Sequence, residues 1–305
     1  MPHRHDIDVR LRSLQDIGKI MRSMKNLSYL ETRKLGRFLD SQRRVVAGIE
    51  AAAQDLLGHH PDLLSETSDG GTLLVLIGAE RGFCGNFNEA IREVLDQESA
   101  AAESAGEVSL ITVGTRLEPL LESDRRVVER LPGATAAEEV PAVLGRLVPA
   151  LSRLTHGRGG RTVQVLTWDS ETEQVGTTPL LPPFGDLRAA ATPERPYPPR
   201  LNMDPRTFLA ALIEHYLFAV LHALLFGSLM AEHQQRVRHL EGALQRVDSR
   251  AGELRQRRNV LRQEEITEEI ELILLNLPPP AEGRAGDEAG LDARGGGPGT
   301  GTVSS

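Results

Sequence analysis

A glycine-rich stretch containing a cysteine follows the apolar run TLLVLI, and it has the residue types with the clearest potential for chemistry. It reads GAERGFCGNFN from Gly78 to Asn88, and Cys84 is the only cysteine in 305 residues. A glycine-rich turn after a buried strand can cradle a phosphate, present a nucleophile, or simply let the backbone turn sharply. Each role makes a different demand on the surrounding residues.

Phosphate binding requires a particular spacing of glycines, because the backbone must curl so that its amides face the anion. The dinucleotide fingerprint is G-x-G-x-x-G, and the P-loop is G-x-x-x-x-G-K-[ST]. Gly78, Gly82 and Gly85 fit neither pattern, and no lysine follows them. The stretch does not favour a nucleotide site, and we expect no cofactor.

A nucleophilic Cys84 would require a positioned base. The nine histidines form no recognisable pattern with it, although folding could bring one close. The pairs His3/His5 and His59/His60 lack carboxylates at a metal-binding spacing, and one cysteine excludes both a disulfide framework and a cysteine-based zinc cluster. We therefore expect no catalytic residue and no metal site, with Cys84 packed as a small apolar residue at the head of a helix.

Charge is unevenly distributed along this acidic chain, whose net charge is −8. Ten Lys or Arg stand against three acids between Arg10 and Arg44. Such a basic helix fits an acidic partner surface, although a solvated face explains it equally well, and the net charge argues against nucleic-acid binding by the whole chain. The charged start MPHRHDIDVR lacks the apolar run of a secretory signal, so we expect the chain to remain in the cytosol.

Two long segments without proline flank a proline-rich middle. Neither 3–60 nor 206–277 contains a proline, and in both segments apolar residues recur at steps of three and four. These features predict two long helices, each with a narrow apolar stripe, and the second begins with the N-cap pair Asp204-Pro205. Neither stripe can be buried by its own helix, so we expect the two helices to pair antiparallel.

Residues 208–230 are nearly all apolar and have the length of a membrane span. Glu214, His215 and His222 lie near the centre of this run, and no cluster of Lys or Arg flanks it. We favour a helix buried on several sides by a neighbouring domain over a membrane span.

The middle of the chain alternates β-rich and helical runs. TLLVLI, VSLITVG and TVQVLTW are expected strands, separated by helical segments, and VGTTPLLP is an expected edge strand. The fold class we predict is a small open α/β sheet domain inserted between the halves of a long antiparallel coiled coil. The expected divisions are 1–60, 72–192 and 204–277, followed by a disordered Gly- and Pro-rich tail at 278–305.

Three stretches together resemble the γ subunit of F-type rotary ATP synthases, and they span most of the chain up to Asn276. The segment 12–25 is similar to the family's opening helix, GAERGFCGNFN to its Arg-Gly-Leu-Cys-Gly-Gly turn, and RNVLRQEEITEEI (258–270) to its Asn-x-x-Arg-Gln-x-x-Ile-Thr-Gln-Glu motif. The order and spacing of the three match as well. The resemblance answers the opening question in favour of a structural turn built by Arg81, Gly82, Cys84, Gly85 and Asn88.

The resemblance implies a central rotor shaft that couples ion flow through a membrane sector to ATP synthesis or hydrolysis in an α/β ring. Implied partners are the α and β subunits, the ε subunit and the c-ring, with no nucleic acid and no direct membrane span. The implied place is the cytoplasmic side of the cell membrane, and the catalytic residues belong to the partners. Contacts with the ring are implied for Met24, Lys25, Arg262, Gln263, Thr267, Glu268 and Glu269.

The chain departs from the family pattern at several positions. LSYLE (27–31) replaces small residues, Asn86 replaces a common second glycine, Glu268 replaces a glutamine, and the tail is additional. A divergent paralogue of the housekeeping shaft fits these departures equally well. Two other functions stay open: a coiled-coil adaptor with a membrane-associated helix at 208–230, and an α/β enzyme that uses Cys84.

Overall fold

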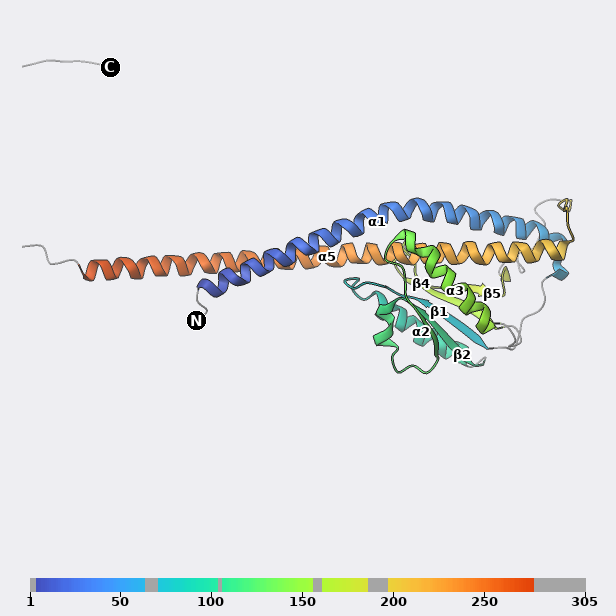
Figure 1. Cartoon of the computed structure of the whole chain (residues 1–305), viewed down its shortest axis with the longest axis horizontal. Helices are drawn as coiled ribbons and strands as arrows, with labels where there is room; N and C mark the ends of the chain where they lie inside the picture. Colours follow the sequence, from blue (N-terminus) through green and yellow to red (C-terminus); the bar gives the residue numbers. More distant parts are fainter. Residues whose placement is uncertain (1–3, 64–70, 104–105, 156–160, 186–196, 277–305) are drawn as a thin grey trace, which may run out of the picture.

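The computed structural model describes residues 4–63, 71–103, 106–155, 161–185 and 197–276. Two long helices, α1 (Arg4–His59) and α5 (Pro205–Leu275), lie side by side, and a small sheet domain packs against one end of the pair (Figure 1). The fold class predicted from the sequence is confirmed. The tail predicted to be disordered lies outside the described residues.

The sheet has five strands in the order β3-β2-β1-β4-β5. β1 (Thr72–Ile77), β2 (Val108–Val113), β3 (Val127–Leu131) and β4 (Thr162–Trp168) run parallel, whereas β5 (Val175–Leu181) is an antiparallel edge strand. The register places Val75 of the central strand β1 between Ile111 and Val165. The expected edge strand is therefore present, and Pro179 lies within it.

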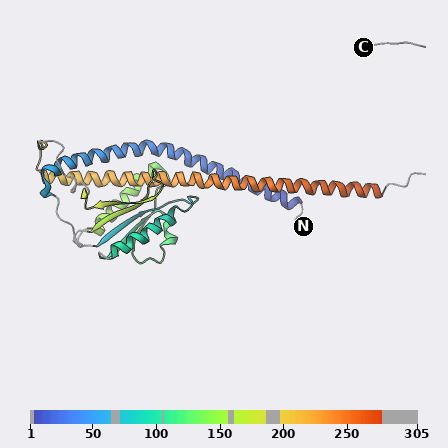
Figure 2. The same ribbon diagram turned by 180° about the vertical axis from the view of Figure 1, so that it is seen from behind.

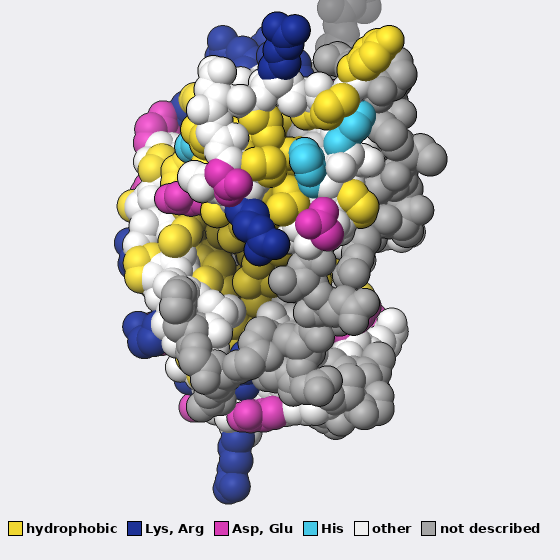
Figure 3. All heavy atoms as spheres, turned by 90° about the vertical axis from the view of Figure 1, so that its right-hand side faces the viewer, with side chains coloured by type: hydrophobic (Ala, Val, Ile, Leu, Met, Phe, Trp, Pro, Cys, Tyr) yellow, Lys and Arg dark blue, Asp and Glu magenta, His cyan; other side chains and the backbone are white. Residues whose placement is uncertain are grey.

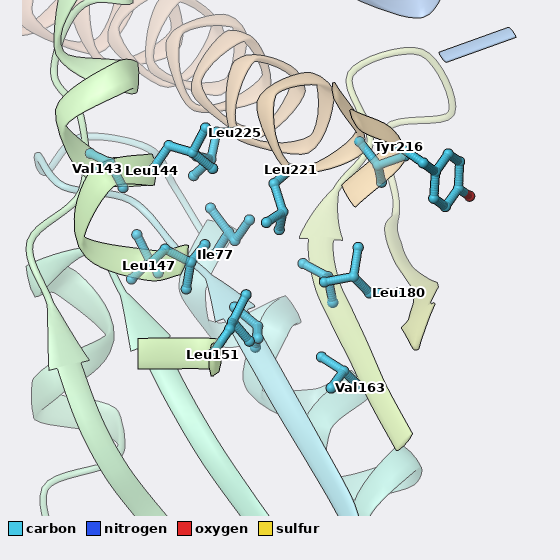
Figure 4. Close-up of a cluster of buried hydrophobic side chains, with 14 of the residues drawn as sticks. Ile77, Val143, Leu144, Leu147, Leu151, Val163, Leu180, Tyr216, Leu221 and Leu225 are labelled. Carbon is cyan, nitrogen blue, oxygen red and sulfur yellow. The ribbon is translucent and has the colours of Figure 1, made fainter. Parts of the chain in front are cut away.

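The two faces of the sheet are covered by different helices (Figures 1 and 2). On one face, Leu74 and Leu76 of β1 join a cluster with Ile91 and Leu95 of α2 (Phe87–Glu103). On the other, Leu73, Val75 and Ile77 pack against α3 (Val140–Thr155) and α5. Figure 4 shows Leu147 and Leu151 of α3 and Leu221 and Leu225 of α5 converging near Ile77 and Val163. Alternate residues of one strand thus fill two cores.

Within the described residues, α5 is the one helix whose length and composition would allow it to cross a membrane. Its apolar part packs against protein: Leu209, Val220 and Leu225 are buried in the core that includes the sheet and Leu35 and Leu39 of α1. Of its most apolar 18-residue window, 44% is buried, so this segment is less enclosed than the sequence favoured.

The two long helices run antiparallel, as ion pairs along their length show. Arg4 binds Glu265 at 2.9 Å, Arg22 binds Asp248 at 3.2 Å and Lys25 binds Glu241 at 3.4 Å. Between these pairs, Met21 packs against Leu240 and Leu244, and Ile7 and Leu11 pack against Ala251. With 71 residues, α5 is about 105 Å long and extends past the start of α1 (Figure 1).

Candidate functional site

The turn GAERGFCGNFN lies at the carboxyl end of β1 and leads into α2. Its backbone is left-handed at Phe83 (φ 66°) and Gly85 (φ 62°). Asn88 closes the turn, because its Oδ1 accepts the backbone N–H of Ala79 at 2.9 Å. Phe83 adopts this conformation despite its Cβ, so other contacts must hold the turn.

Cys84 is buried within the turn, at 4% exposure. Its Sγ lies 3.1 Å from the Arg81 carbonyl oxygen and 3.2 Å from Nη2 of Arg236. Burial raises the pKa of the Cys84 thiol to about 12, against the smaller opposing effect of the Arg236 charge. Since the thiolate is the nucleophilic form, this environment does not suit catalysis.

A buried ion pair on α5 holds the turn in place. Glu232 and Arg236, both 3% exposed, are one helical turn apart and bind each other. The Glu232 carboxylate also accepts the backbone N–H groups of Glu80 at 3.1 Å and Arg81 at 3.3 Å. Arg236 donates to the carbonyl oxygens of Gly82 at 3.0 Å and Arg81 at 3.2 Å. The side chains of one helix therefore satisfy consecutive backbone groups of the turn.

This junction lies where an open α/β sheet usually binds a ligand. The chain leaves β1 toward β2 and β3 on one side and later crosses to β4 on the other, so the carboxyl ends of β1 and β4 flank the topological switch point. Here α5 fills the crevice: Ser228 donates to the Ile77 carbonyl at 3.2 Å, and Glu232 takes up two amides that would otherwise face an anion. The Glu232 carboxylate of α5 therefore occupies the place that a bound anion would take.

A second carboxylate, that of Glu80, ties neighbouring strand ends together. It accepts the backbone N–H groups of Thr115 at 3.0 Å and Gly133 at 2.7 Å, which follow β2 and β3. Gly114 has φ 103°, and a side chain there would lie 2.5 Å from the Gly78 carbonyl oxygen. The turn, three strand ends and α5 thus form one bonded unit.

A cavity of about 270 Å³ lies beside this unit, between α1 and α5. Its lining includes Ser28 and Glu31 of α1, Thr135, and His233 and Arg236 of α5. Burial, with the nearby Arg236 charge, lowers the pKa of His233 to about 4, so its imidazole is neutral at pH 7. Arg236 Nη1 lies 3.0 Å from His233 Nδ1, which as the acceptor carries no proton.

The residues for which the sequence implies ring contacts lie in two separate places. Met24 is half-buried against the Met21–Leu240–Leu244 cluster, and Lys25 pairs with Glu241. The other set, Arg262, Gln263, Thr267, Glu268 and Glu269, is exposed near the far end of α5. Arg262 lies eighteen positions beyond Leu244 on α5, or about 27 Å along the helix, so the structure does not bring the two sets together.

The end of α5 is exposed throughout. No residue beyond Ala251 is buried in the described part of the chain, and Ile266, Ile270 and Leu272 are 45%, 51% and 60% exposed. The Thr267 side chain bonds within its own helix, where Oγ1 donates to the Gln263 carbonyl at 2.9 Å. This apolar and charged tip is available to a partner.

A second hollow opens at the opposite end of the molecule. Figure 3 shows apolar side chains in a depression there, and an apolar hollow of about 750 Å³ is lined by Val148, Leu151, Leu181, Ile213 and Phe218. Among the described residues, no group of three or more His, Cys, Asp or Glu could hold a metal ion.

Sequence reasoning missed Glu232, His233 and Arg236. A usable signal was present, because Glu232 and Arg236 are four residues apart directly after an apolar run expected to be buried on several sides. Charged residues in such a place need partners.

Comparison with known proteins identifies relatives over most of the chain. A family model described as ATP synthase matches residues 3–274. The ATP synthase gamma chain of Stenotrophomonas maltophilia is 23% identical over 283 residues, covering 88% of this chain and 96% of the relative. That of Caldanaerobacter subterraneus is 24% identical over 294 residues, with the same shares.

Solved structures share the fold. A chain in the rotor of the Euglena gracilis mitochondrial ATP synthase has a TM-score of 0.55 at 14% identity, covering 86% of this chain and 98% of that one. A chain in its OSCP/F1/c-ring assembly has a TM-score of 0.57 at 15% identity, covering 92% and 98%. A chain in the central stalk and c-ring of the Tetrahymena thermophila enzyme has a TM-score of 0.54 at 17% identity, covering 73% and 99%.

Proposed function

The chain belongs to the ATP synthase family, and we propose that it is the central rotor shaft of an F-type ATP synthase. The observation that carries the proposal is the antiparallel pair of α1 and α5, anchored in a sheet domain at one end and exposed at the other. A rod of this shape transmits rotation between two assemblies. Full-length similarity to gamma chains supports the same role.

The shaft acts on the ring through its asymmetric shape. Near its tip α5 extends alone past α1, so the rod presents different side chains at different angles (Figure 1). Inside a ring of three α and three β subunits, each angle favours a different conformation of each β subunit. Because a partner shifts an equilibrium only by its differential binding to the two states, rotation changes nucleotide affinity at the three catalytic sites in turn. The residues that catalyse ATP synthesis and hydrolysis belong to the β subunits.

The two predicted contact sets would serve at two levels of the ring. The exposed Arg262, Gln263, Thr267, Glu268 and Glu269 would meet the α and β subunits from inside, where the Glu268 carboxylate adds charge. Met24 and Lys25 would lie at a lower level, beside the basic face of α1. Because Lys25 already pairs with Glu241, its contact with β would compete with this exposed bond, which is worth less than about 1 kcal/mol.

The sheet domain and the adjoining helix ends would sit on the c-ring with the ε subunit. The chain is part of the membrane-associated F1 complex, peripheral and, in our proposal, on the cytoplasmic side of the cell membrane. Functionally it would divide as 1–60 and 204–277 for the shaft and 72–192 for the base. The coupling ion can be H⁺ or Na⁺.

Co-expression with the α and β subunits of its own cell tests this function. We expect a complex with one copy of this chain per three α and three β by native mass, with ATPase activity in the same fraction. A chain ending at Arg262 should lower that activity, whereas a chain ending at Asn276, just beyond the family match, should not. A chain that stays apart from α and β would contradict the proposal and favour a coiled-coil adaptor.

A further inference from the structure

We propose that Glu232 and Arg236 form a torsional clamp that makes α5 the torque-carrying helix of the shaft where it leaves the sheet domain. The proposal rests on the proposed function as a rotor shaft. It assigns to this ion pair a positioning role, since it fixes the angle of α5 relative to the base.

The clamp residues form their hydrogen bonds with backbone atoms of the turn, which are less mobile than the ends of side chains. Its partners are the amides of Glu80 and Arg81 and the carbonyls of Arg81 and Gly82, directly after the buried central strand β1. With side chains about 5–6 Å from the helix axis, a 30° rotation of α5 moves the carboxylate by about 3 Å. Such a displacement breaks these hydrogen bonds, so they resist rotation of the helix.

The position of the clamp on α5 matters as much as its bonds. Up to Leu229, α5 is buried against the sheet and α3 as well as α1. From Leu240 onward its buried contacts within the described ranges are with α1, at Met21 and then at Ile7 and Leu11. Glu232 and Arg236 lie between these regions, where a stiff base continues into a thinner rod and twisting strain concentrates.

At this level α1 is attached more loosely. It faces the cavity of about 270 Å³ through Ser28 and Glu31, and the ion pair nearest to this cavity, Lys34–Glu138, is partly exposed (31% and 65%). From Leu35 onward, α1 is buried in the core that includes the sheet. An exposed pair contributes little to stability because solvent screens it, whereas breaking a buried pair leaves an unpaired charge inside the protein. The two helices are therefore not equivalent at this level: α5 is bound to the turn by buried charges, whereas α1 faces a cavity.

Variants of the assembled enzyme in membrane vesicles test the clamp. Glu232→Gln and Arg236→Met should retain most of the ATP hydrolysis but lose most of the ATP-driven ion pumping, read with a potential-sensitive dye. Lys34→Met is the matched control and should pump like the wild type. Wild-type pumping per ATP in both clamp variants, or an equal loss in the control, would overturn the proposal.

Hydrogen exchange on the isolated chain separates this proposal from the proposed function. The amides of Glu80 and Arg81 should exchange about tenfold faster in Glu232→Gln and stay unchanged in Lys34→Met. Unchanged exchange in Glu232→Gln would overturn the clamp, even for a variant that fails to assemble. A wild-type chain that never joins α and β refutes the shaft function instead, and leaves the exchange result intact.

Discussion

His233 shows how one buried side chain makes stability depend on pH. Its side chain is 5% exposed, and burial together with the charges of Arg236 and Arg81 lowers its pKa from 6.5 to about 4, against an opposing effect of the Thr135 backbone. Between these two values the unfolded chain binds a proton that the folded chain does not. This contribution to stability is therefore complete above pH 6.5 and is lost as the pH falls toward 4.

We expect the free energy of unfolding of the isolated chain to fall by up to about 3 kcal/mol between pH 7 and pH 4 on account of His233. Denaturant titrations at a series of pH values measure this slope, and His233→Gln should reduce it. His222, whose pKa burial also lowers, leaves a smaller slope of the same sign in the variant. An equal slope in wild type and variant would contradict the assignment.

Glu232 acts in the opposite direction at the same junction. Burial raises the pKa of its carboxyl, against the effects of Arg236 and of the two turn amides. The stability linked to this group is present at low pH and is lost as the pH rises through the folded-state pKa. Glu232 and His233 thus change the free energy of unfolding with pH in opposite directions, and single-site variants are needed to separate the two effects.

The seam between α1 and α5 depends on few side chains. Leu240 is fully buried between Met21 and Leu244, whereas Ile266, further along the same helix, is 45% exposed. Leu240→Ala should therefore destabilise the hairpin by about 2–4 kcal/mol, because it removes buried methyl groups and leaves a cavity. Ile266→Ala should change stability by less than about 0.5 kcal/mol. Urea titrations followed by far-UV circular dichroism compare the two variants. Similar urea midpoints for both would contradict the conclusion that the pairing of α1 and α5 depends on buried Leu240.

The long elements could be predicted from the sequence because their signals are strong and repeated. Proline-free segments and apolar steps of three and four indicated both helices, and the Asp204-Pro205 start is observed, with the Asp204 carboxylate accepting the Arg206 and Thr207 amides. Short elements were less visible. β3 (VVERL) was missed because it is an edge strand with a mixed pattern. The first of the helical segments expected after VSLITVG, TRLEPLLE, forms only a 3-10 helix at Thr115–Leu120, which contains Pro119.

The junction could not be predicted, because it depends on the distance in space between Glu80 and Glu232. These residues are 152 positions apart, and neither belongs to a short motif that implies the other. The spacing of the glycines in the turn argued against nucleotide chemistry there. That α5 takes the place of the ligand follows only from the strand order and the path of the helix.

The whole molecule is stiff at one end and weakly supported at the other. At the base, α5 is enclosed by the sheet, α3 and α1, and the rings of Phe38 and Phe226 stack at 5.6 Å between the two helices. Toward the tip only a narrow seam remains, and Ile17 and Ile20 of α1 are 47% and 62% exposed. These exposed apolar side chains require the surrounding ring for burial.

This gradient predicts that the isolated chain frays from the tip. Amide hydrogen exchange should show the greatest protection in α5 at residues 209–229, less at 240–251, and little at 260–275, because an isolated helix is marginal without buried area. Assembly with the α and β subunits should raise protection most in the last segment, where a ring would cover residues that are now exposed. Uniform protection of α5 to Leu275 in the isolated chain would mean that the narrow seam suffices, and the tip would then enter the ring already ordered.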